Sequence, residues 1–544
     1  MLEHWPETHC YHARMPSLLA PFLNSLADMF KPAADREPPS PFFTPEEIGR
    51  LHRAGMDPKT ALDEQTWHDL LLESWEERLA QDTSVYGRQL LHRRLRAGLP
   101  DADCAALSAR LRSLLDDPAR LDALTKALRP LRFAETEVAG LLFGGPGHDM
   151  PQPPWWSGLL WMLPLLLLLS LGLLATQPLG WMATLAALAP LMALQISYHQ
   201  RIELWKNTLD SLNALLAGSH TLAALGGPLL DPFVEARATA ARLHKRIARS
   251  LLVRMIPGGE AYLNWFAAYN VRRYWKTIRA VAAARDFLRA CYRRSAELEA
   301  DVALARHLRR QDHWCWAERS AARTLDLRGG VHPLMETPVP LSLSLDGQGA
   351  FISGQNASGK STFLRMVGLN LVAARAFGFC YAEKARLPAV PVRASMQNED
   401  SLLGGESLYM SELRRARELL EASGNPAGIC LVDEVFRGTN HLESVSAASA
   451  VLESLCERDL VLVSSHNLVL ARILAAKFEP FRIDTASGRP VLLPGVLGDP
   501  NGIALLATQG FGAQIEGRAA EVARWLSKHL AEPEAKEPPA LSCA

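Results

Sequence analysis

The stretch GAFISGQNASGKSTFLRMVGLNL, residues 349–371, contains a complete phosphate-binding loop of the form G-x-x-x-x-G-K-S. Gly354 and Gly359 permit a tight turn whose backbone N–H groups point inward at phosphate oxygens. The apolar residues before the loop predict the end of a buried strand, and the apolar spacing after it predicts a helix. In this setting we expect Lys360 to reach the outer phosphates and the Ser361 hydroxyl to bind Mg²⁺. The stretch therefore predicts a nucleotide site at a strand-loop-helix junction.

Later apolar strands supply polar groups for the same site. Residues 429–432 run into Asp433 and Glu434, and residues 460–463 lead to His466. Hydrolysis of a phosphoanhydride needs a carboxylate for the metal and a base in line with the γ-phosphate. We therefore expect Asp433 to hold Mg²⁺ and Glu434 to orient or deprotonate the attacking water. His466 is expected at the same sheet edge, in contact with the γ-phosphate.

The composition sets broad limits on the protein class. A chain of 544 residues predicts three or four domains at about 150 residues each, and a formal net charge of zero indicates no particular partner. The eight cysteines include no C-x-x-C pair, which argues against a zinc site and a disulfide framework and favours a reducing cytoplasm for the soluble parts. The mixed, polar N-terminus lacks the order of a signal peptide.

Residues 155–198 contain no charged side chain and predict a transmembrane hairpin. The stretch divides at residues 177–180 into two apolar segments of about twenty residues each, long enough to span a bilayer. Tryptophans near the ends resemble interfacial anchors, and Arg201 and Lys206 just beyond favour a cytoplasmic location for the flanking parts. We expect a multi-pass protein of the inner (cytoplasmic) membrane, with its soluble domains in the cytoplasm. The alternative is a buried helical hairpin in a soluble core.

The remaining patterns predict the domain organisation. Helical spacing dominates on both sides of the hairpin, whereas short apolar runs alternate with helices from about residue 330. The predicted fold is an α/β ATPase domain with a mostly parallel sheet, preceded by an all-α core and lever domain that the hairpin interrupts. The predicted segments are a weakly structured 1–44, a helical core 45–150, a hairpin region 151–199 with spans at about 155–176 and 179–198, a basic helical region 200–312, an ATPase domain 313–520 and a tail 521–544.

The helical segment 237–310 is strongly basic, with 17 Lys or Arg against 5 Asp or Glu. One interpretation is a phosphate-binding surface for DNA or for anionic lipid headgroups. The other is the solvated face of long helices, since charge runs of this kind are common on helix surfaces.

The order of these motifs resembles the ATPase domain of the MutS family of DNA mismatch-repair proteins, which belongs to the ABC-type ATPases. The resemblance rests on GQNASGKST, GESLYMSELRRARELL, LVDEVFRGTN and SSHN, on the segment 315–335 with its Val331-His332-Pro333, and on LLPGVLGDPNGIALLATQGF near the C-terminus. The segment 62–95 is similar to the start of the family's helical core. Together these cover roughly residues 60–135 and 313–515.

The resemblance implies a role for each matching residue. It gives nucleotide contacts to the loop and its flanks, the metal to Ser361 and Asp433, the base to Glu434 and a sensor role to His466. The implied nucleotide contacts are Gly354, Asn356, Gly359, Lys360, Ser361 and Thr362. Ser407 matches the signature serine that completes the partner subunit's site, so a homodimer is implied, with residues 437–440 coupling one site to the other. The implied cofactors are ATP and Mg²⁺.

The chain also departs from the family pattern. Residues ahead of Leu62 are too few for the mismatch-reading and connector domains, and Phe133-Ala134-Glu135 is the sole approximate copy of the family's Phe-x-Glu wedge, inside a predicted core helix. The hairpin stands where lever helices and a DNA clamp are expected.

Three functions remain open from the sequence. The first is a membrane-anchored, dimeric MutS-like ATPase that binds DNA through residues 237–310 and is related to mismatch repair. The second is a membrane-bound, ATP-driven switch that acts on a protein partner without DNA. The third is an ABC-type half-transporter, which the two spans and the missing L-S-G-G-Q signature disfavour.

Overall fold

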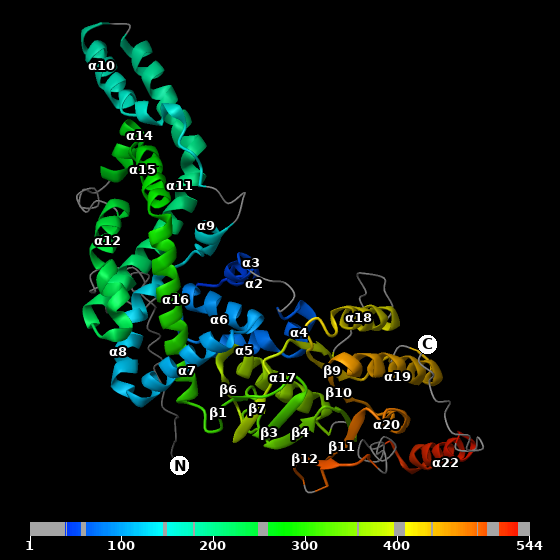
Figure 1. Ribbon diagram of the computed structural model, residues 1–544. Coiled ribbons are helices and arrows are strands. Elements are labelled where there is room, and N and C mark those ends of the chain that lie inside the picture. The colour runs from blue at the N-terminus through cyan, green and yellow to red at the C-terminus, as the bar shows by residue number, and fades with distance from the viewer. Residues whose placement is uncertain are drawn as a thin grey trace, which may run out of the picture. The chain divides into compact units, whose positions relative to one another are not determined.

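The chain forms two compact units, each assembled from separated segments of sequence (Figure 1). The computed structural model describes residues 39, 41–55, 61–144, 150–177, 180–248, 259–355, 358–396, 408–436, 439–486, 488–497 and 511–530. The first unit combines Met1–Glu47, Ser84–Tyr86 and Asp122–Glu299, and the second combines Ile48–Thr83, Gly87–Leu121 and Ala300–Ala544. The sequence-based boundaries delimit contiguous blocks, whereas each unit recruits segments that are distant in the chain.

The described elements of the first unit are all helical, as the sequence predicts. Elements that cross a unit boundary are given with the unit that holds most of their residues. They are α2 (Pro45–Ile48), α8 (Pro118–Leu128), α9 (Ala139–Phe143), α10 (Met162–Thr176), α11 (Gly180–Leu225), α12 (Asp231–Ile247), α14 (Gly259–Ala267), α15 (Tyr269–Ala283), α16 (Arg285–Leu308) and the short 3-10 helices Arg129–Phe133, Trp155–Leu159 and Pro228–Leu230.

The ends of these helices follow from local sequence. Before α2, the Thr44 hydroxyl accepts from the N–H of Glu47, and the Glu47 carboxylate accepts from the N–H of Thr44, which forms a reciprocal capping box. The long helix α11 runs for 46 residues, includes Pro190 and Gly218, and ends before Gly226 and Gly227. Gly226 and Gly227 adopt positive φ angles, 67° and 109°, which side chains rarely permit.

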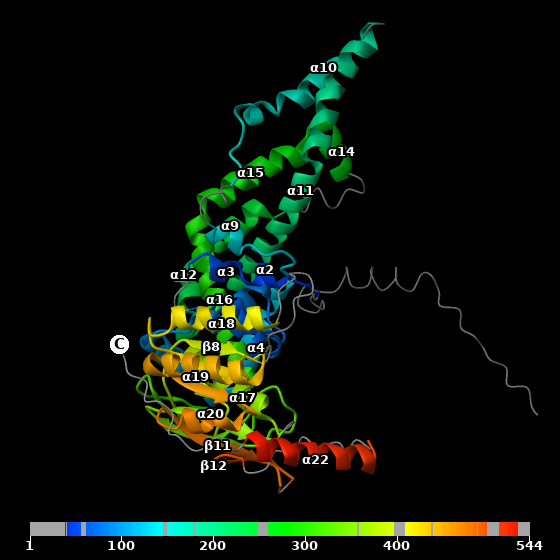
Figure 2. The same ribbon diagram turned by 90° about the vertical axis from the view of Figure 1, so that its right-hand side faces the viewer.

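The predicted hairpin exists as a pair of packed helices, α10 and α11, which lie side by side in both views (Figures 1 and 2). Gly180 permits the close turn, since a Cβ atom there would lie 2.4 Å from the Leu174 Cα. The Thr184 hydroxyl donates to the carbonyl oxygen of Ser170 at 3.3 Å.

The sequence predicts that both arms of the hairpin span a membrane. Among the described residues, only one of the two helices is long enough to do so. Helix α11 is long and apolar enough to cross a bilayer, whereas α10 has 15 residues. Fifteen helical residues rise about 22 Å, less than the roughly 30 Å of a hydrocarbon core. The first arm is shorter than predicted because the segment Trp155–Leu159 forms a 3-10 turn instead of joining the α-helix.

A six-stranded sheet forms the centre of the second unit, in the order β12-β11-β5-β10-β9-β8. Its strands are β5 (Gly349–Gly354), β8 (Val392–Ser395), β9 (Ile429–Asp433), β10 (Leu460–Ser464), β11 (Phe478–Asp484) and β12 (Val491–Pro494). Every neighbouring pair is parallel except β11 with β12. The prediction of a mostly parallel sheet is therefore confirmed.

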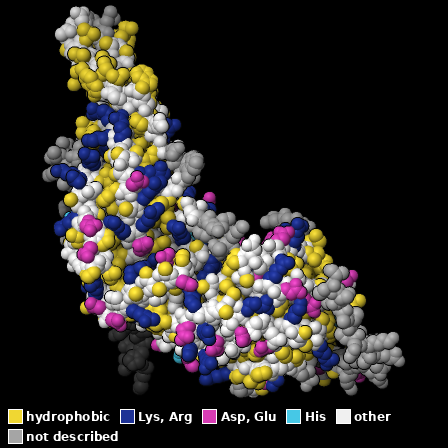
Figure 3. All heavy atoms as spheres, viewed as in Figure 1, with side chains coloured by type: hydrophobic (Ala, Val, Ile, Leu, Met, Phe, Trp, Pro, Cys, Tyr) yellow, Lys and Arg dark blue, Asp and Glu magenta, His cyan; other side chains and the backbone are white. Residues whose placement is uncertain are grey.

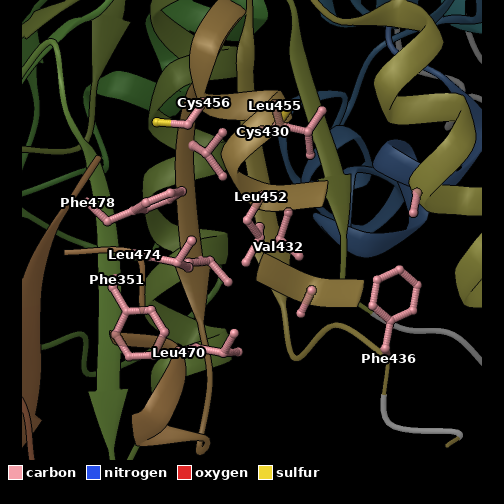
Figure 4. Close-up of a cluster of buried hydrophobic side chains, with 14 of the residues drawn as sticks. Phe351, Cys430, Val432, Phe436, Leu452, Leu455, Cys456, Leu470, Leu474 and Phe478 are labelled. Carbon is pink, nitrogen blue, oxygen red and sulfur yellow. The ribbon is translucent and has the colours of Figure 1, made fainter. Parts of the chain in front are cut away.

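Helices cover both faces of this sheet, which explains its apolar strands. Helix α17 (Lys360–Phe377) packs across β5, β8, β9 and β10, whereas α18 (Leu408–Ala422), α19 (His441–Arg458) and α20 (Leu468–Ile473) belong to the other face. Figure 4 shows Phe351, Cys430 and Val432 from the strands among the side chains of α19 and α20. Alternate strand residues turn to α17, where Leu431 lies close to Gly368.

Smaller sheets and further helices complete the described part of this unit. A four-stranded sheet has the order β2-β7-β3-β4, and β1 pairs with β6. The sequence predicts a single, mostly parallel sheet and does not indicate that these strands form sheets of their own. They are β1 (Cys315–Trp316), β2 (Glu318–Arg319), β3 (Thr324–Gly330), β4 (Leu341–Asp346), β6 (Phe379–Cys380) and β7 (Lys384–Leu387), with helices α3 (Arg50–Arg53), α4 (Glu64–Asp69), α5 (Leu72–Leu79), α6 (Val85–Ala97), α7 (Asp101–Asp116) and, near the C-terminus, α22 (Ala513–Leu530).

Helix α4 covers the open edge of the parallel sheet at β8. The Thr66 hydroxyl accepts from the N–H of Ala394 at 2.9 Å, and the Asp69 carboxylate accepts from the N–H of Met396 at 2.8 Å. Both side chains are fully buried. Two polar side chains thus satisfy backbone donors that an edge strand would otherwise leave exposed.

Candidate nucleotide-binding and hydrolysis site

The phosphate-binding loop lies between β5 and α17, as the sequence predicts. Gly359 adopts a φ of 94°, which ends the loop and lets α17 begin at Lys360. The Lys360 ammonium donates to the carbonyl oxygens of Gly354 and Gln355, both at 3.2 Å, so it lies over the loop. The first N–H groups of α17 have no partner within the helix, and they face the same loop. These donors and the ammonium form an anion site at a helix N-terminus.

The loop fits a phosphate group by its own geometry. A Cβ atom at Gly354 would lie 2.5 Å from the Ser358 Oγ, so the loop closes too tightly there for a side chain. The Ser358 hydroxyl is buried and has no hydrogen-bond partner among the described residues. A buried polar atom of this kind is rare in a folded protein. A phosphate oxygen would satisfy it.

Three adjacent strands deliver the remaining groups to the same edge. Strand β10 lies between β5 and β9, and the register aligns Ser464 with both Ile352 and Asp433. Because all three strands are parallel, their carboxyl ends meet beside the loop. The structure thus places the segment that leads to His466 on the strand next to that of the phosphate-binding loop, and Asp433 on the strand after it, in a strand order that was not predicted.

Asp433 is held by a neighbour that the sequence did not single out. The Ser464 hydroxyl donates to the Asp433 Oδ1, and Ser464 is fully buried. The Asp433 carboxylate and the Ser361 hydroxyl are oxygen ligands, which is the donor type that Mg²⁺ prefers. The residues present therefore fit the magnesium ion that the loop implies.

Glu434 leaves the sheet in a strained conformation. Its φ is 55°, in the left-handed region that non-glycine residues rarely occupy, and its N–H donates to the Ser464 carbonyl oxygen at 2.9 Å. The Glu434 Oε1 lies 3.3 Å from the Nδ1 of His466. The Glu434 side chain is 22% exposed and that of His466 is 61% exposed, so both are accessible from solvent. This carboxylate-imidazole pair adds a contact to the roles expected from the sequence.

Some expected site residues lie outside the described part of the chain. Asn356, Ser407 and residues 437–438 are among them. Thr362 lies in the first turn of α17, half-buried beside Ser361. The loop contact of Asn356, the signature role of Ser407 and the coupling role of residues 437–440 stay predictions.

Sequence reasoning also missed Arg415 on α18, the helix that follows Ser407. Its guanidinium donates to the carbonyl oxygen of Ala394 and lies 3.1 Å from the Asp63 Oδ1. Asp63 in turn accepts from the N–H of Thr66 and caps α4. The ion pair joins residues that are 352 positions apart, so no local pattern could indicate it.

Comparison with known proteins places this geometry in a family. The family model for MutS domain V matches residues 350–484, which contain the loop, Asp433, Glu434 and His466. The chain therefore contains a domain of the MutS family over these residues. The MutS resemblance seen in the sequence is thereby confirmed.

Several similar proteins are DNA mismatch repair proteins MutS. That of Thermus aquaticus is 32% identical over 246 residues, which cover 43% of this chain and 30% of the relative. That of Treponema pallidum (strain Nichols) is 29% identical over 272 residues, 46% of this chain and 30% of the relative. That of Thermotoga maritima is 37% identical over 150 residues, 26% of this chain and 19% of the relative. The chain thus aligns with less than a third of the length of each of these MutS proteins.

Proposed function

We propose that this MutS-family chain binds ATP with Mg²⁺ and hydrolyses it at the edge formed by β5, β10 and β9. The observation that supports this most strongly is the register that brings the phosphate-binding loop, Asp433 and Glu434 together on adjacent strands. Lys360 and the N-terminus of α17 hold the phosphates. Bound Mg²⁺ would neutralise charge that develops on the transferred phosphoryl group.

Each polar group then has one role in hydrolysis. Asp433 and Ser361 hold the metal, and Ser464 keeps the Asp433 carboxylate in place. Glu434 accepts the proton of the attacking water or orients that water in line with the γ-phosphate. His466, 3.3 Å from Glu434, positions that carboxylate and responds to the γ-phosphate. The ATP site is proposed to work as a dimer, with Ser407 of one chain completing the site of the other.

The dimer proposal has a direct complementation test. Ser407→Ala protein and Lys360→Ala protein should each be inactive alone. Mixed dimers contain one site that unites wild-type Lys360 with wild-type Ser407, so mixing should restore part of the activity. Absence of any restoration in verified mixed dimers would contradict a shared site.

We further propose that the hairpin of α10 and α11 enters the inner membrane from the cytoplasmic side, with α11 as its long arm, so that both soluble parts stay in the cytoplasm. Only 22% of the most apolar stretch of α11 is buried. Large side chains such as Leu168, Leu169 and Leu185 are more than half exposed, and Figure 3 shows hydrophobic side chains gathered over the α10 end of the molecule. An apolar surface of this extent favours a lipid environment over a soluble core.

DNA is the proposed partner of the exposed cations on α12. Arg237, Arg242, Lys245 and Arg246 are all exposed along that helix. Cations on one helix neutralise DNA phosphates without reading sequence. The proposal relates the protein to mismatch repair only through its family, and direct recognition of mismatches is not part of it.

A specific observation favours the switch without DNA as the second candidate. Several arginines of the basic region donate to backbone carbonyls instead of facing solvent. Arg285 and Arg289 bond the carbonyl of Leu142, and Arg294 bonds that of Pro232. Fewer cationic side chains of residues 237–310 are therefore available to contact DNA phosphates than the net charge of this segment indicates.

One experiment separates the two candidates. The ATPase rate of the full chain in detergent is measured with and without duplex, mismatched and branched DNA, at low and high salt. A response to DNA that fades with salt supports the DNA-directed function, because counterion release makes phosphate binding strongly salt-dependent. A rate that no DNA changes supports the switch that acts on a protein.

A further inference from the structure

The first unit contains a cavity of about 770 Å³ between α11, α14 and α15. The α11 residues that line it run from Gln195 to Asp210 at helical spacing, so they share one face of the helix. The charge-free stretch of α11 ends at Tyr198. The cavity therefore begins in the last apolar turn and continues along the charged part of the same helix.

Helix α14 carries exposed aromatic side chains beside the last apolar turns of α11. The Gln195 Nε2 donates to the carbonyl oxygen of Asn264 at 2.6 Å, which fixes α14 beside the last apolar turns of α11. Tyr262, Trp265 and Phe266 of α14 are 67%, 48% and 47% exposed. Exposed aromatic rings at the boundary between apolar and charged residues are typical of a membrane-water interface. The cavity opens at this boundary.

The lining carries charges of both signs. Lys206 and Arg273 supply positive charge, and Glu203 and Asp210 supply negative charge. The Lys206 Nζ lies 3.3 Å from the Glu203 Oε2, but this pair is partly exposed and therefore weak. A lining with balanced charge suits a zwitterion better than the uniformly anionic backbone of a nucleic acid.

Two amides at the apolar end of the cavity, those of Gln195 and Asn270, hydrogen-bond each other. The Asn270 Nδ2 donates to the Gln195 Oε1 at 2.7 Å, and the Gln195 Nε2 donates to the Asn270 Oδ1 at 2.9 Å. Gln195 is buried. The Asn264 Oδ1 is buried without a hydrogen-bond partner among the described residues, and Arg273 already donates to the carbonyl oxygen of Ile247 at 2.8 Å. A ligand would therefore meet the Asn264 amide at the apolar end and the charged side chains farther along α11 and α15.

We infer that this cavity binds the headgroup of an aminophospholipid such as phosphatidylethanolamine. The phosphodiester lies toward Lys206 and Arg273, the primary ammonium lies toward Glu203 and Asp210, and the acyl chains follow the exposed side chain of Ile196 into the bilayer. The two carboxylates select a primary ammonium because its N–H groups donate to them, whereas a quaternary ammonium has none. This inference rests on the proposed membrane anchoring.

The test uses the purified full chain in mixed micelles, with phosphatidylethanolamine, phosphatidylglycerol or phosphatidylcholine as the added lipid. Native mass spectrometry measures the lipid bound per chain. We expect preferential binding of phosphatidylethanolamine, and we expect Lys206→Gln to weaken it about tenfold, the low end for a hydrogen bond to a charged group because Lys206 is partly exposed. Glu203→Gln should also weaken it. The matched control is Lys276→Gln, since Lys276 is exposed on α15 and does not line the cavity.

The outcomes separate this inference from the anchoring on which it rests. Flotation with vesicles made from each of the three lipids is measured in parallel. A chain that floats with none of them contradicts the membrane proposal and the cavity together. If the chain floats with all three lipids, the membrane proposal stands. The lipid-binding role of the cavity is then refuted if phosphatidylethanolamine is not preferred, or if Lys206→Gln and Lys276→Gln bind it equally.

Discussion

Replacing Ser464 by alanine tests how the metal carboxylate is positioned. The Ser464 hydroxyl is fully buried and donates to the Asp433 Oδ1. A hydrogen bond to a charged group contributes about 1.5–3 kcal/mol, which corresponds to about 10- to 100-fold in affinity. The backbone carbonyl of Ser464, which accepts from the N–H of Glu434, is retained in the variant. We therefore expect weaker Mg²⁺ binding with the base still in place.

The assay measures the Mg²⁺ concentration that gives half-maximal ATP turnover. Mn²⁺ bound in the presence of ATP, counted by electron paramagnetic resonance, gives a readout independent of turnover. Both should shift by about 10- to 100-fold in Ser464→Ala, while the turnover at saturating Mg²⁺ changes much less. The control is Ser465→Ala, because the Ser465 Oγ is also buried but accepts from the N–H of Asn467. An unchanged Mg²⁺ dependence in Ser464→Ala, or an equal shift in the control, refutes this role for Ser464.

Three further variants probe the loop, the docked helix and a buried histidine. Gly354→Ala places a Cβ atom 2.5 Å from the Ser358 Oγ and should weaken binding of a fluorescent ATP analogue by about fivefold or more, since overpacking costs about 1–3 kcal/mol; normal binding would contradict the tight loop. Arg415→Ala should lower the free energy of unfolding in urea by about 2 kcal/mol, because it removes a buried guanidinium that donates to the Ala394 carbonyl oxygen and to Asp63. Arg417→Ala, at an 80% exposed side chain, should change it little, and equal effects would contradict a stabilising role for Arg415. Burial lowers the pKa of His307 from 6.5 to about 4, so the stability that its neutral form contributes is present above pH 6.5 and is lost as the pH falls toward 4. Between about pH 7 and about pH 5, the urea midpoint of His307→Gln should fall less than that of the wild type, and an equal fall would refute this.

The parts of the fold that local sequence determines were predictable. The phosphate-binding loop needs a strand before it and a helix after it, and the apolar spacing on each side of residues 354–361 indicates both. The strands before Asp433 and His466 are continuous apolar runs because helices cover both faces of the sheet. Helices α12 and α15 follow from their apolar periodicity.

The parts that depend on long-range contacts were not predictable from one sequence. The position of β10 between β5 and β9 is a choice of topology, and it alone brings Ser464 to Asp433. The Arg415–Asp63 pair likewise joins distant segments. The length of α10 depended on whether residues 155–159 continue the helix, and hydropathy does not distinguish a 3-10 turn from an α-helix there.

The most direct test of ATP hydrolysis at this edge is a comparison of the full wild-type chain with Glu434→Gln. ATP binding is measured with radiolabelled nucleotide, and turnover is measured as phosphate released. The proposed base role predicts that the variant binds ATP like the wild type and hydrolyses it about 100-fold more slowly or worse. Hydrolysis at the wild-type rate by Glu434→Gln would show that Glu434 is not the base and that this edge of the sheet does not carry out the reaction as proposed.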